Sequence, residues 1–301
     1  MKILHVTRQF HPLVGGLENY VLALAEEQVK MGHDVTVVTL NKSFIDGQKL
    51  PATGKINNIN VKRIPYSGVK KYPLAPSVFK HLKNHDLIHV HAVDFFLDFI
   101  AFTKVFHKKK FVLHTHGGFF HTSWARIFKK IFFHTITRAS LLAVHKVVAS
   151  SDNDYKTFSD ISRKIIRIDN GVQVNKFIRV SKESIEKNTI IYIGRIDIHK
   201  GIGKLIDLIA CLHANGSRAT LRVVGPDWKG LVPSFLKKAA DAGVSDSVHF
   251  LGIVDNDTML EELSKACVFV SASEYEGFGI SAVEAMASGT PCILNDIHSF
   301  R

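Results

Sequence analysis

Short apolar runs rich in β-branched residues alternate along the chain with longer segments whose apolar residues recur every three or four positions. A short run of this kind is typical of a buried strand, and the longer period is typical of a helix with one apolar face. In the first half, the pattern predicts strands at 2–7, 34–40, 60–64, 87–91, 110–115 and 146–150. Between them it predicts helices at 16–31, 77–84, 95–105 and 123–143.

The alternation resumes after residue 188, with strands predicted at 189–194, 219–225, 248–251, 267–271 and 291–295. Strands that alternate with helices are typical of βαβ units, which place helices on both faces of a parallel sheet. We therefore expect an α/β chain of two facing Rossmann-like domains, 1–172 and 173–301, divided near the Asn170-Gly171 turn. Because the chain ends shortly after the last predicted strand, we expect the second domain to be incomplete at its carboxyl end.

The composition supports two domains, each with a hydrophobic core, and excludes several classes of protein. A chain of 301 residues with 46% hydrophobic residues is neither disordered nor collagen-like. The three cysteines are odd in number and lack a CxxC pair, which argues against a disulfide framework and a structural zinc site. We find no signal peptide and no apolar stretch of membrane-spanning length, so the expected location is the cytoplasm.

Positive charge is concentrated in the first half of the chain. Residues 1–150 contain 21 Lys and Arg against 8 Asp and Glu, whereas residues 151–301 contain 18 against 19. The first half also holds 14 of the 21 Phe, which makes it both basic and aromatic. This bias predicts an anionic surface or a polyanionic partner for the first domain.

Candidate binding residues follow the strands, because ligands of such folds usually bind at the carboxyl ends of the sheet. After the first predicted strand, Gly15 and Gly16 precede a helix, where backbone N–H groups can approach an anion. The segment is not GxGxxG, so the dinucleotide fingerprint is absent there. A plain turn between strand and helix is the alternative interpretation of Gly16.

The end of the predicted strand 110–115 carries histidines. His114 and His116 lie on one face of the strand and are followed by two glycines that leave room for a ligand. A metal site would have to add His121 or the pair His89 and His91, and no carboxylate or cysteine lies at ligand spacing. We therefore favour a sugar or phosphate contact by His116 over a metal.

Two more strand ends carry polar or charged residues. Ser151 follows the predicted strand 146–150, where its hydroxyl can contact a ligand or cap the next helix. Arg195 and Lys200 follow the first strand of the second domain and could neutralise a diphosphate. The segment is not a Walker A loop, and a solvated basic loop is the alternative interpretation.

The most informative segment is a glycine-rich loop that leads into an apolar helix near the end of the chain. Glu276 lies in the loop, Gly277, Phe278 and Gly279 lead into the helix, and Glu284 lies within the helix. Amide groups at such a helix start suit a diphosphate, and carboxylates that only accept hydrogen bonds suit sugar and ribose hydroxyls. The segment therefore predicts a nucleotide-sugar site.

This segment resembles the family 4 glycosyltransferases of GT-B fold, which carry a Glu, seven residues and a second Glu, here Glu276 and Glu284. Six further segments match that family in order across nearly the whole chain. They are Gly15-Gly16-Leu17-Glu18, His116-Gly117, Asn170-Gly171-Val172, Gly194-Arg195 with Lys200-Gly201, Val224-Gly225 and Phe250-Leu251-Gly252.

Within that family the chain is similar to the mannosyltransferases of the xanthan and acetan exopolysaccharide pathways. The resemblance implies retaining transfer of mannose from GDP-mannose to cellobiosyl-diphosphopolyprenol, through an α-1,3 link and without a metal. It rests on Arg8-Gln9-Phe10-His11-Pro12, Tyr72-Pro73-Leu74-Ala75-Pro76-Ser77, Thr115-His116-Gly117-Gly118-Phe119-Phe120-His121-Thr122 and Ser151-Asp152-Asn153-Asp154.

The resemblance also implies roles for individual residues. His116 and Ser151 would lie on the acceptor side of the catalytic cleft, and Arg195 and Lys200 would hold the donor diphosphate. Glu276 would hold the transferred sugar without acting as a covalent nucleophile. The rest of the implied donor site is Glu284 on the nucleotide ribose, with Gly16, Gly277, Phe278 and Gly279 nearby.

The predicted helix 123–143 indicates a membrane contact. From Trp124 to Leu142 its apolar residues recur at helical spacing, with Arg126, Lys129 and Lys130 among them. Such a helix can lie on an anionic leaflet and meet a lipid-linked acceptor, which predicts peripheral binding to the inner face of the cell membrane. An ordinary helix packed on the sheet is the alternative interpretation.

Three other functions compete with glycosyl transfer. A sugar-nucleotide 2-epimerase has the same architecture and binds a similar donor. A basic, Phe-rich domain could bind nucleic acid, although no nucleic-acid-binding motif is present and we expect none to bind. The third alternative is an inactive relative that only binds a sugar nucleotide or a membrane partner.

Overall fold

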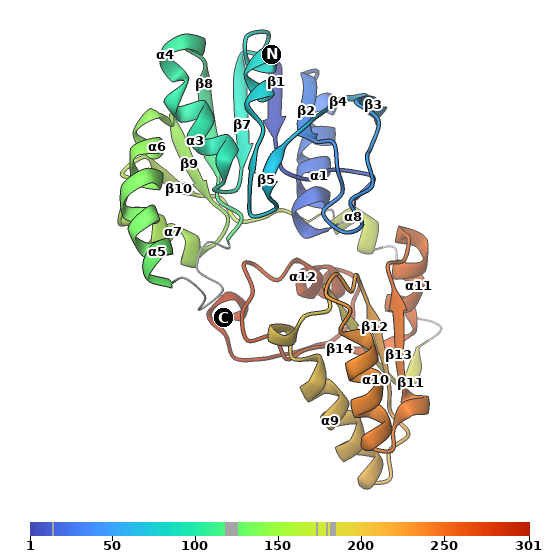
Figure 1. The fold of residues 1–301 in the computed structure, drawn as a ribbon. Helices are drawn as coiled ribbons and strands as arrows, with labels where there is room; N and C mark the ends of the chain where they lie inside the picture. Colours follow the sequence, from blue (N-terminus) through green and yellow to red (C-terminus); the bar gives the residue numbers. More distant parts are fainter. Residues whose placement is uncertain (14, 118–125, 173, 179, 181–184) are drawn as a thin grey trace. The chain divides into compact units, whose positions relative to one another are not determined.

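The computed structural model describes residues 1–301 except 14, 118–125, 173, 179 and 181–184 (Figure 1). The chain divides into two compact units, Met1–Gly171 and Val172–Arg301. The division falls one residue before the boundary placed from the sequence. Among the described residues, no helix is long and apolar enough to cross a membrane.

The first unit contains an eight-stranded sheet in the order β10-β9-β8-β7-β1-β2-β4-β3. All neighbouring strands are parallel except β3 and β4. The six strands expected from the sequence are present, and β3 and β10 are additional. The bounds are β1 Lys2–Val6, β2 Asp34–Leu40, β3 Thr53–Ile56, β4 Ile59–Ile64, β7 Leu87–His91, β8 Lys110–His114, β9 Lys146–Ala149 and β10 Ile165–Arg167, with a separate hairpin of β5 Ser67–Val69 and β6 Tyr72–Leu74.

Helices cover both faces of this sheet (Figure 1). Alternation along β2 sends Val37 toward a core shared with α1 and Val38 toward a core shared with α3. The described part of the expected helix 123–143 is α5, a π-helix at Phe133–Thr137 and α6. The helix bounds are α1 Gly16–Lys30, α2 Phe79–Leu82, α3 Phe95–Phe102, α4 Lys104–His107, α5 Arg126–Phe132, α6 Arg138–Ala143 and α7 Asp152–Ser159.

The second unit contains a five-stranded parallel sheet in the order β13-β12-β11-β14-β15. Ile190 and Ile191 of β11 face two separate cores, one shared with α9 and α10 and the other with α8, α11 and α12. The strands are β11 Glu186–Ile193, β12 Thr220–Val224, β13 Val248–Gly252, β14 Ala266–Ser271 and β15 Cys292–Leu294. The helices are α8 Val174–Phe177, α9 Ile202–Ala214, α10 Val232–Asp241, α11 Asn256–Lys265 and α12 Ile280–Ala287.

Each unit is therefore a parallel or mostly parallel sheet with helices on both faces, as expected for Rossmann-like domains. The strand ends bring distant residues together, because the register of a parallel sheet is fixed by its ladder. In the first unit His5 lies beside His89, and His91 lies beside His114. These histidines belong to the part of the candidate site that lies in the first unit.

Candidate functional site

His116 lies two residues beyond β8, in a left-handed backbone conformation with φ of 53°. This conformation is uncommon for a residue other than glycine and has to be held by its surroundings. The buried Asp154 carboxylate accepts hydrogen bonds from Gly117 N at 2.7 Å, from Ser150 Oγ at 2.9 Å and from the Thr115 hydroxyl. Asp154 therefore fixes the chain on both sides of His116.

Ser151 belongs to the same cluster. It caps α7, and its Oγ accepts a hydrogen bond from Asp154 N at 3.2 Å. The capping role expected from the sequence is confirmed, whereas ligand contact by Ser151 stays a prediction. The sequence analysis gave Asp154 no role of its own, although a serine followed three residues later by an acid is the pattern of a helix start.

Five histidines gather at the strand ends of the first unit. His116 Nε2 lies 2.9 Å from His91 Nδ1, and His91 Nε2 lies 2.8 Å from His5 Nδ1. His5 Nε2 in turn lies 2.7 Å from Gln28 Oε1 of α1. His114 Nδ1 lies 3.4 Å from the Tyr20 hydroxyl. Only His114 and His116 were predicted to share a face, because the other contacts depend on sheet register.

The nitrogens of two histidine groups lie close enough to consider a metal. They lie within 4.8 Å of one another in His5, His89 and His91, and again in His91, His114 and His116. The 2.8 and 2.9 Å pairs are shorter than the separation of about 3.3 Å between ligands of tetrahedral zinc. These distances fit hydrogen bonds between rings. The Nε2 atoms of His89 and His114 are buried without a partner among the described residues, and His121 lies outside those residues.

Burial keeps all five imidazoles uncharged. It lowers the pKa of His5 and of His114 to about 4. It also lowers the pKa of His89, His91 and His116 well below the ordinary value, and the neighbouring rings lower these values further. Neutral imidazoles can each donate one hydrogen bond and accept one, which is what a row of linked rings requires.

In the second unit, Lys200 and Glu276 form an ion pair with 2.6 Å between Nζ and Oε1. Their side chains are only 12% and 17% exposed, so solvent screens the pair weakly. Ser273 Oγ donates to the same carboxylate oxygen at 2.8 Å. The pair lies at a small hollow of about 40 Å³, lined by Ile193, Gly194, Lys200, Phe269, Ser271, Glu276, Gly279, Ile280, Ser281, Ala282 and Phe300.

Helix α12 begins at this hollow. Its N-cap is Gly279, whose φ of 88° is left-handed, and Ile280 and Ser281 of its first turn line the hollow. The first amide groups of a helix have no partner within the helix and carry partial positive charge, so they attract an anion. The predicted combination of a cation, a carboxylate and a glycine-rich helix start is therefore assembled in one place.

Other predicted residues of the second unit lie outside the lining of this hollow. Burial raises the pKa of the Glu284 carboxyl in α12 to about 7, and the Lys176 ammonium opposes the shift. The guanidinium of Arg195 lies over the Trp228 ring, 5.5 Å from its centre. Gly277 and Phe278 connect Glu276 to α12.

Gly16, the remaining predicted donor residue, is the first residue of α1 in the first unit. In the second unit, Ser273 was missed. It is completely buried, and its position three residues before Glu276 was the available signal.

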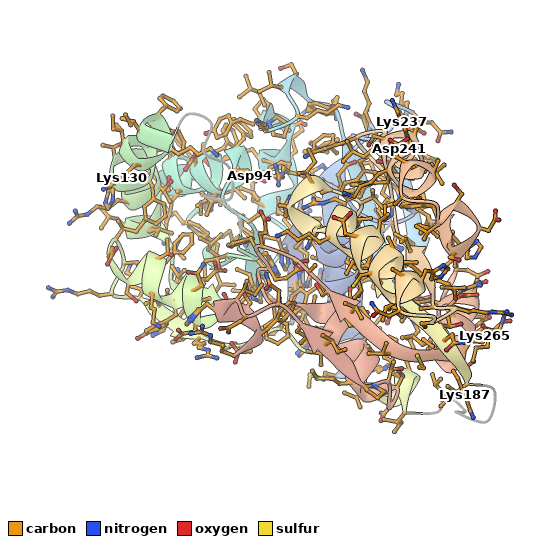
Figure 2. All side chains as sticks on the ribbon, turned by 90° about the horizontal axis from the view of Figure 1, so that it is seen from below. Asp94, Lys130, Lys187, Lys237, Asp241 and Lys265 are labelled. Carbon is orange, nitrogen blue, oxygen red and sulfur yellow. The ribbon has the colours of Figure 1, made fainter. Side chains whose placement is uncertain are left out.

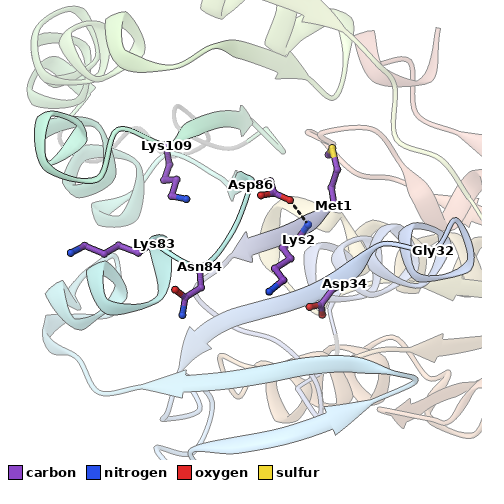
Figure 3. Close-up of a pocket in the computed structure, with 8 residues that line it drawn as sticks. All are labelled: Met1, Lys2, Gly32, Asp34, Lys83, Asn84, Asp86 and Lys109. Atoms are coloured by element: carbon purple, nitrogen blue, oxygen red, sulfur yellow. Dashed lines mark hydrogen bonds between the residues drawn. The ribbon is translucent and has the colours of Figure 1, made fainter.

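A second, open hollow of about 430 Å³ lies in the first unit at the amino ends of β1, β2 and β7 (Figure 3). Lysines and acids line it, and the Lys2 backbone N–H donates to Asp86 Oδ2 at 2.8 Å. Ligands of parallel α/β sheets bind at the carboxyl ends of the strands. We therefore assign the site to the carboxyl ends, where His116 lies, and not to this hollow.

Comparison with protein families covers both units. The model described as Glycosyltransferase Family 4 matches residues 14–176, and the model described as Glycosyl transferases group 1 matches residues 174–301. The chain belongs to glycosyltransferase family 4. The family expected from the Glu276 and Glu284 segment is thereby confirmed.

Named relatives and solved structures agree with this assignment. The chain is 39% identical over 302 residues to a GDP-mannose:cellobiosyl-diphosphopolyprenol alpha-mannosyltransferase of Komagataeibacter xylinus, covering all of this chain and 77% of the relative. A protein of the same name from Xanthomonas campestris is 36% identical, with 80% of it covered. This protein is therefore a hexosyltransferase.

Solved structures confirm the GT-B fold. Sucrose-phosphate synthase from Thermosynechococcus elongatus matches with a TM-score of 0.76 at 19% identity, covering the whole chain and 82% of that structure. Anabaena Alr3699/HepE in complex with UDP and glucose matches with a TM-score of 0.74 over the same shares, also at 19% identity. At this identity the likeness concerns the fold alone.

Proposed function

We propose that this glycosyltransferase moves mannose from GDP-mannose to cellobiosyl-diphosphopolyprenol, forming an α-1,3 link with retained configuration. Two observations support the proposal. The relatives that carry the corresponding name align with the entire chain at 36–39% identity. In addition, the hollow at Lys200 and Glu276 combines the charges that a sugar diphosphate needs.

The donor site follows from the chemistry of each group. Lys200, with Arg195 nearby in sequence, neutralises the diphosphate, and the amides that begin α12 donate to it. Glu276 accepts hydrogen bonds from hydroxyls of the transferred mannose, and Glu284 accepts them from the ribose. Without a donor, Lys200 and Glu276 neutralise each other, 2.6 Å apart. When the diphosphate binds, it shares Lys200, and Glu276 becomes available to the sugar.

The reaction requires stabilisation of the departing GDP while the acceptor hydroxyl attacks. Positive groups fixed at the diphosphate stabilise the charge that develops there, with no metal taking part. In the first unit His116 and Ser151 form the acceptor side, and Asp154 holds both of them in place. Gly16 allows close approach of the backbone at the start of α1.

Transfer of radiolabelled mannose from GDP-mannose to the cellobiosyl lipid tests this function. We expect Lys200→Ala and Glu276→Ala each to lower transfer at least a hundredfold, because each leaves a partly buried charge without its partner and removes a donor contact. Lys204→Ala is the matched control, since Lys204 pairs with Glu274 on the exposed surface. If both site variants retain full transfer, the assignment of the site is wrong.

Product analysis separates this function from that of a sugar-nucleotide 2-epimerase, which would change the donor without consuming the acceptor. The named relatives are transferases and do not favour the epimerase.

We also propose that the enzyme binds the inner face of the cell membrane through α5. Ile127, Phe128 and Ile131 are 79%, 67% and 58% exposed, and they lie within one turn of one another. Lys130, also exposed, projects from the same helix (Figure 2). Apolar side chains flanked by cations suit the boundary of an anionic leaflet. The start of the expected helix, including Trp124, lies outside the described residues.

Flotation with vesicles that contain anionic lipid tests this contact. We expect Ile127→Ser combined with Phe128→Ser to reduce the bound fraction, and Lys130→Glu to reduce it further at low salt. Ile253→Ser is the control, because Ile253 is similarly exposed in the second unit. Unchanged flotation of the α5 variants would reject the contact, as would a chain that binds a generic oligonucleotide and no vesicle.

A further inference from the structure

A row of four hydrogen-bonded side chains runs from α1 to His116 in the first unit. The links are Gln28 Oε1 to His5 Nε2 at 2.7 Å, His5 Nδ1 to His91 Nε2 at 2.8 Å, and His91 Nδ1 to His116 Nε2 at 2.9 Å. His5 and His91 are completely buried, whereas Gln28 and His116 are partly exposed. The row therefore connects α1 to the acceptor side of the site.

With Gln28 Oε1 facing His5 Nε2, the row has a defined polarity. A neutral imidazole carries a proton on one nitrogen and a lone pair on the other, and burial keeps these three rings neutral. An amide oxygen only accepts, so His5 Nε2 carries its proton. His5 Nδ1 then accepts from His91 Nε2–H, and His91 Nδ1 accepts from His116 Nε2–H. The row ends in a lone pair on His116 Nδ1, which has no partner among the described residues.

We propose that Gln28, His5 and His91 are positioning residues that hold His116 in its Nε2–H tautomer, so that Nδ1 accepts a hydrogen bond from the hydroxyl of the acceptor sugar. The identity of that ligand rests on the proposed function. An attacking hydroxyl uses an oxygen lone pair to form the new bond to mannose as the bond between mannose and the diphosphate breaks, and the hydroxyl proton ends on the departing GDP. A partner that accepts the hydroxyl hydrogen leaves this lone pair free, whereas an N–H donor at Nδ1 would occupy it.

Substitutions of Gln28 can keep, remove or reverse the polarity, and this partly exposed residue lies outside the catalytic machinery. Gln28→Glu offers only acceptors and keeps the polarity. Gln28→Lys offers only donors, so each proton has to move to the other nitrogen of its ring. Gln28→Met offers neither and leaves the polarity free. Glu27→Met, at the adjacent exposed position, is the control.

Nitrogen NMR of the full chain reads the tautomer directly, because protonated and unprotonated ring nitrogens have well-separated shifts. His116→Asn identifies the His116 signals. We expect the wild type to favour protonated Nε2 over protonated Nδ1 by at least about fivefold, the effect of one net hydrogen bond on an equilibrium. Gln28→Lys should reverse the preference, and Gln28→Glu should keep it.

Transfer kinetics show whether the enzyme uses this polarity. We expect kcat to fall at least about tenfold in Gln28→Lys, because the reversed tautomer removes the hydrogen bond from the acceptor hydroxyl to His116 Nδ1. As the hydroxyl attacks it gains positive charge, and a hydrogen bond of a charged group is about twice as strong as a neutral one. It should stay within about twofold in Gln28→Glu, with donor affinity unchanged in both. A wild-type Nδ1–H tautomer would overturn the proposal, as would a reversed tautomer with unchanged kcat. If no variant, wild type included, transfers mannose, the proposed function fails while NMR still decides the polarity.

Discussion

Glu284 should make donor affinity depend on pH near neutrality. Burial raises the pKa of its carboxyl to about 7, despite the opposing Lys176 ammonium. The ionised carboxylate accepts from ribose hydroxyls, whereas the protonated group loses part of that capacity. With this pKa, the ionised fraction rises from about one-tenth at pH 6 to about nine-tenths at pH 8. We therefore expect the Kd for GDP-mannose to fall over this range, by up to about tenfold.

Calorimetric titration with GDP-mannose at several pH values measures the effect. The donor is suitable because its diphosphate is esterified at both ends and keeps a constant charge between pH 6 and pH 8. Glu284→Gln should bind more weakly than the wild type at pH 8 and show a flat profile. Glu261→Gln, at an exposed carboxylate of α11, should keep the wild-type slope. A flat wild-type profile, or an equal slope in Glu284→Gln, would refute the role of Glu284.

Three further results follow from the contacts of single residues. Asp154→Ala should lower the free energy of unfolding by about 3 kcal/mol in a denaturant titration, because three donors lose their acceptor, and Asp154→Asn should cost less. Gly279→Ala should lower both the free energy of unfolding and the affinity for GDP-mannose more than Gly289→Ala does. Both positions have left-handed φ, at +88° and +75°, but a side chain at Gly279 would also meet the Phe300 ring. Glu284→Gln should raise donor-free stability by ~2 kcal/mol above pH 8 and little below pH 4. The pKa of Glu284 rises from 4.5 to about 7 on folding, so the wild type loses stability as the pH rises from 4.5 to 7 and stays at the lower value above 7.

The sequence predicts a helix or strand best where the residues of that element alone show a clear hydrophobic pattern. β2 and β7 have the expected bounds, because both are short runs of mostly buried residues rich in Val, Ile and Leu, as is typical of strands in a parallel sheet. The strands β3 and β10 at the two edges are only four and three residues long, which is too short for either to stand out as a strand in the pattern. The π-helix at Phe133–Thr137 was not predicted either, because helical spacing does not reveal one extra residue in a turn.

At the site, the sequence identifies single residues from their motifs, but it does not show which of them are in contact. Lys200 and Glu276 could be chosen from their motifs, but their pairing across 76 residues depends on how the strands are ordered. His5 and His91 meet only because β1 and β7 are neighbours in a defined register. Asp154 contacts the His116 loop across the end of β9. No local pattern carries that information.

The structure of the reaction product tests the central claim most directly. Purified chain would be incubated with GDP-mannose and cellobiosyl-diphosphopolyprenol, and the released glycan would be examined by NMR and mass spectrometry. We predict a trisaccharide with one added mannose in α-1,3 linkage, formed with release of one GDP per transfer. A β-linked product, an epimerised donor with intact acceptor, or transfer that persists in Lys200→Ala and Glu276→Ala would contradict the account.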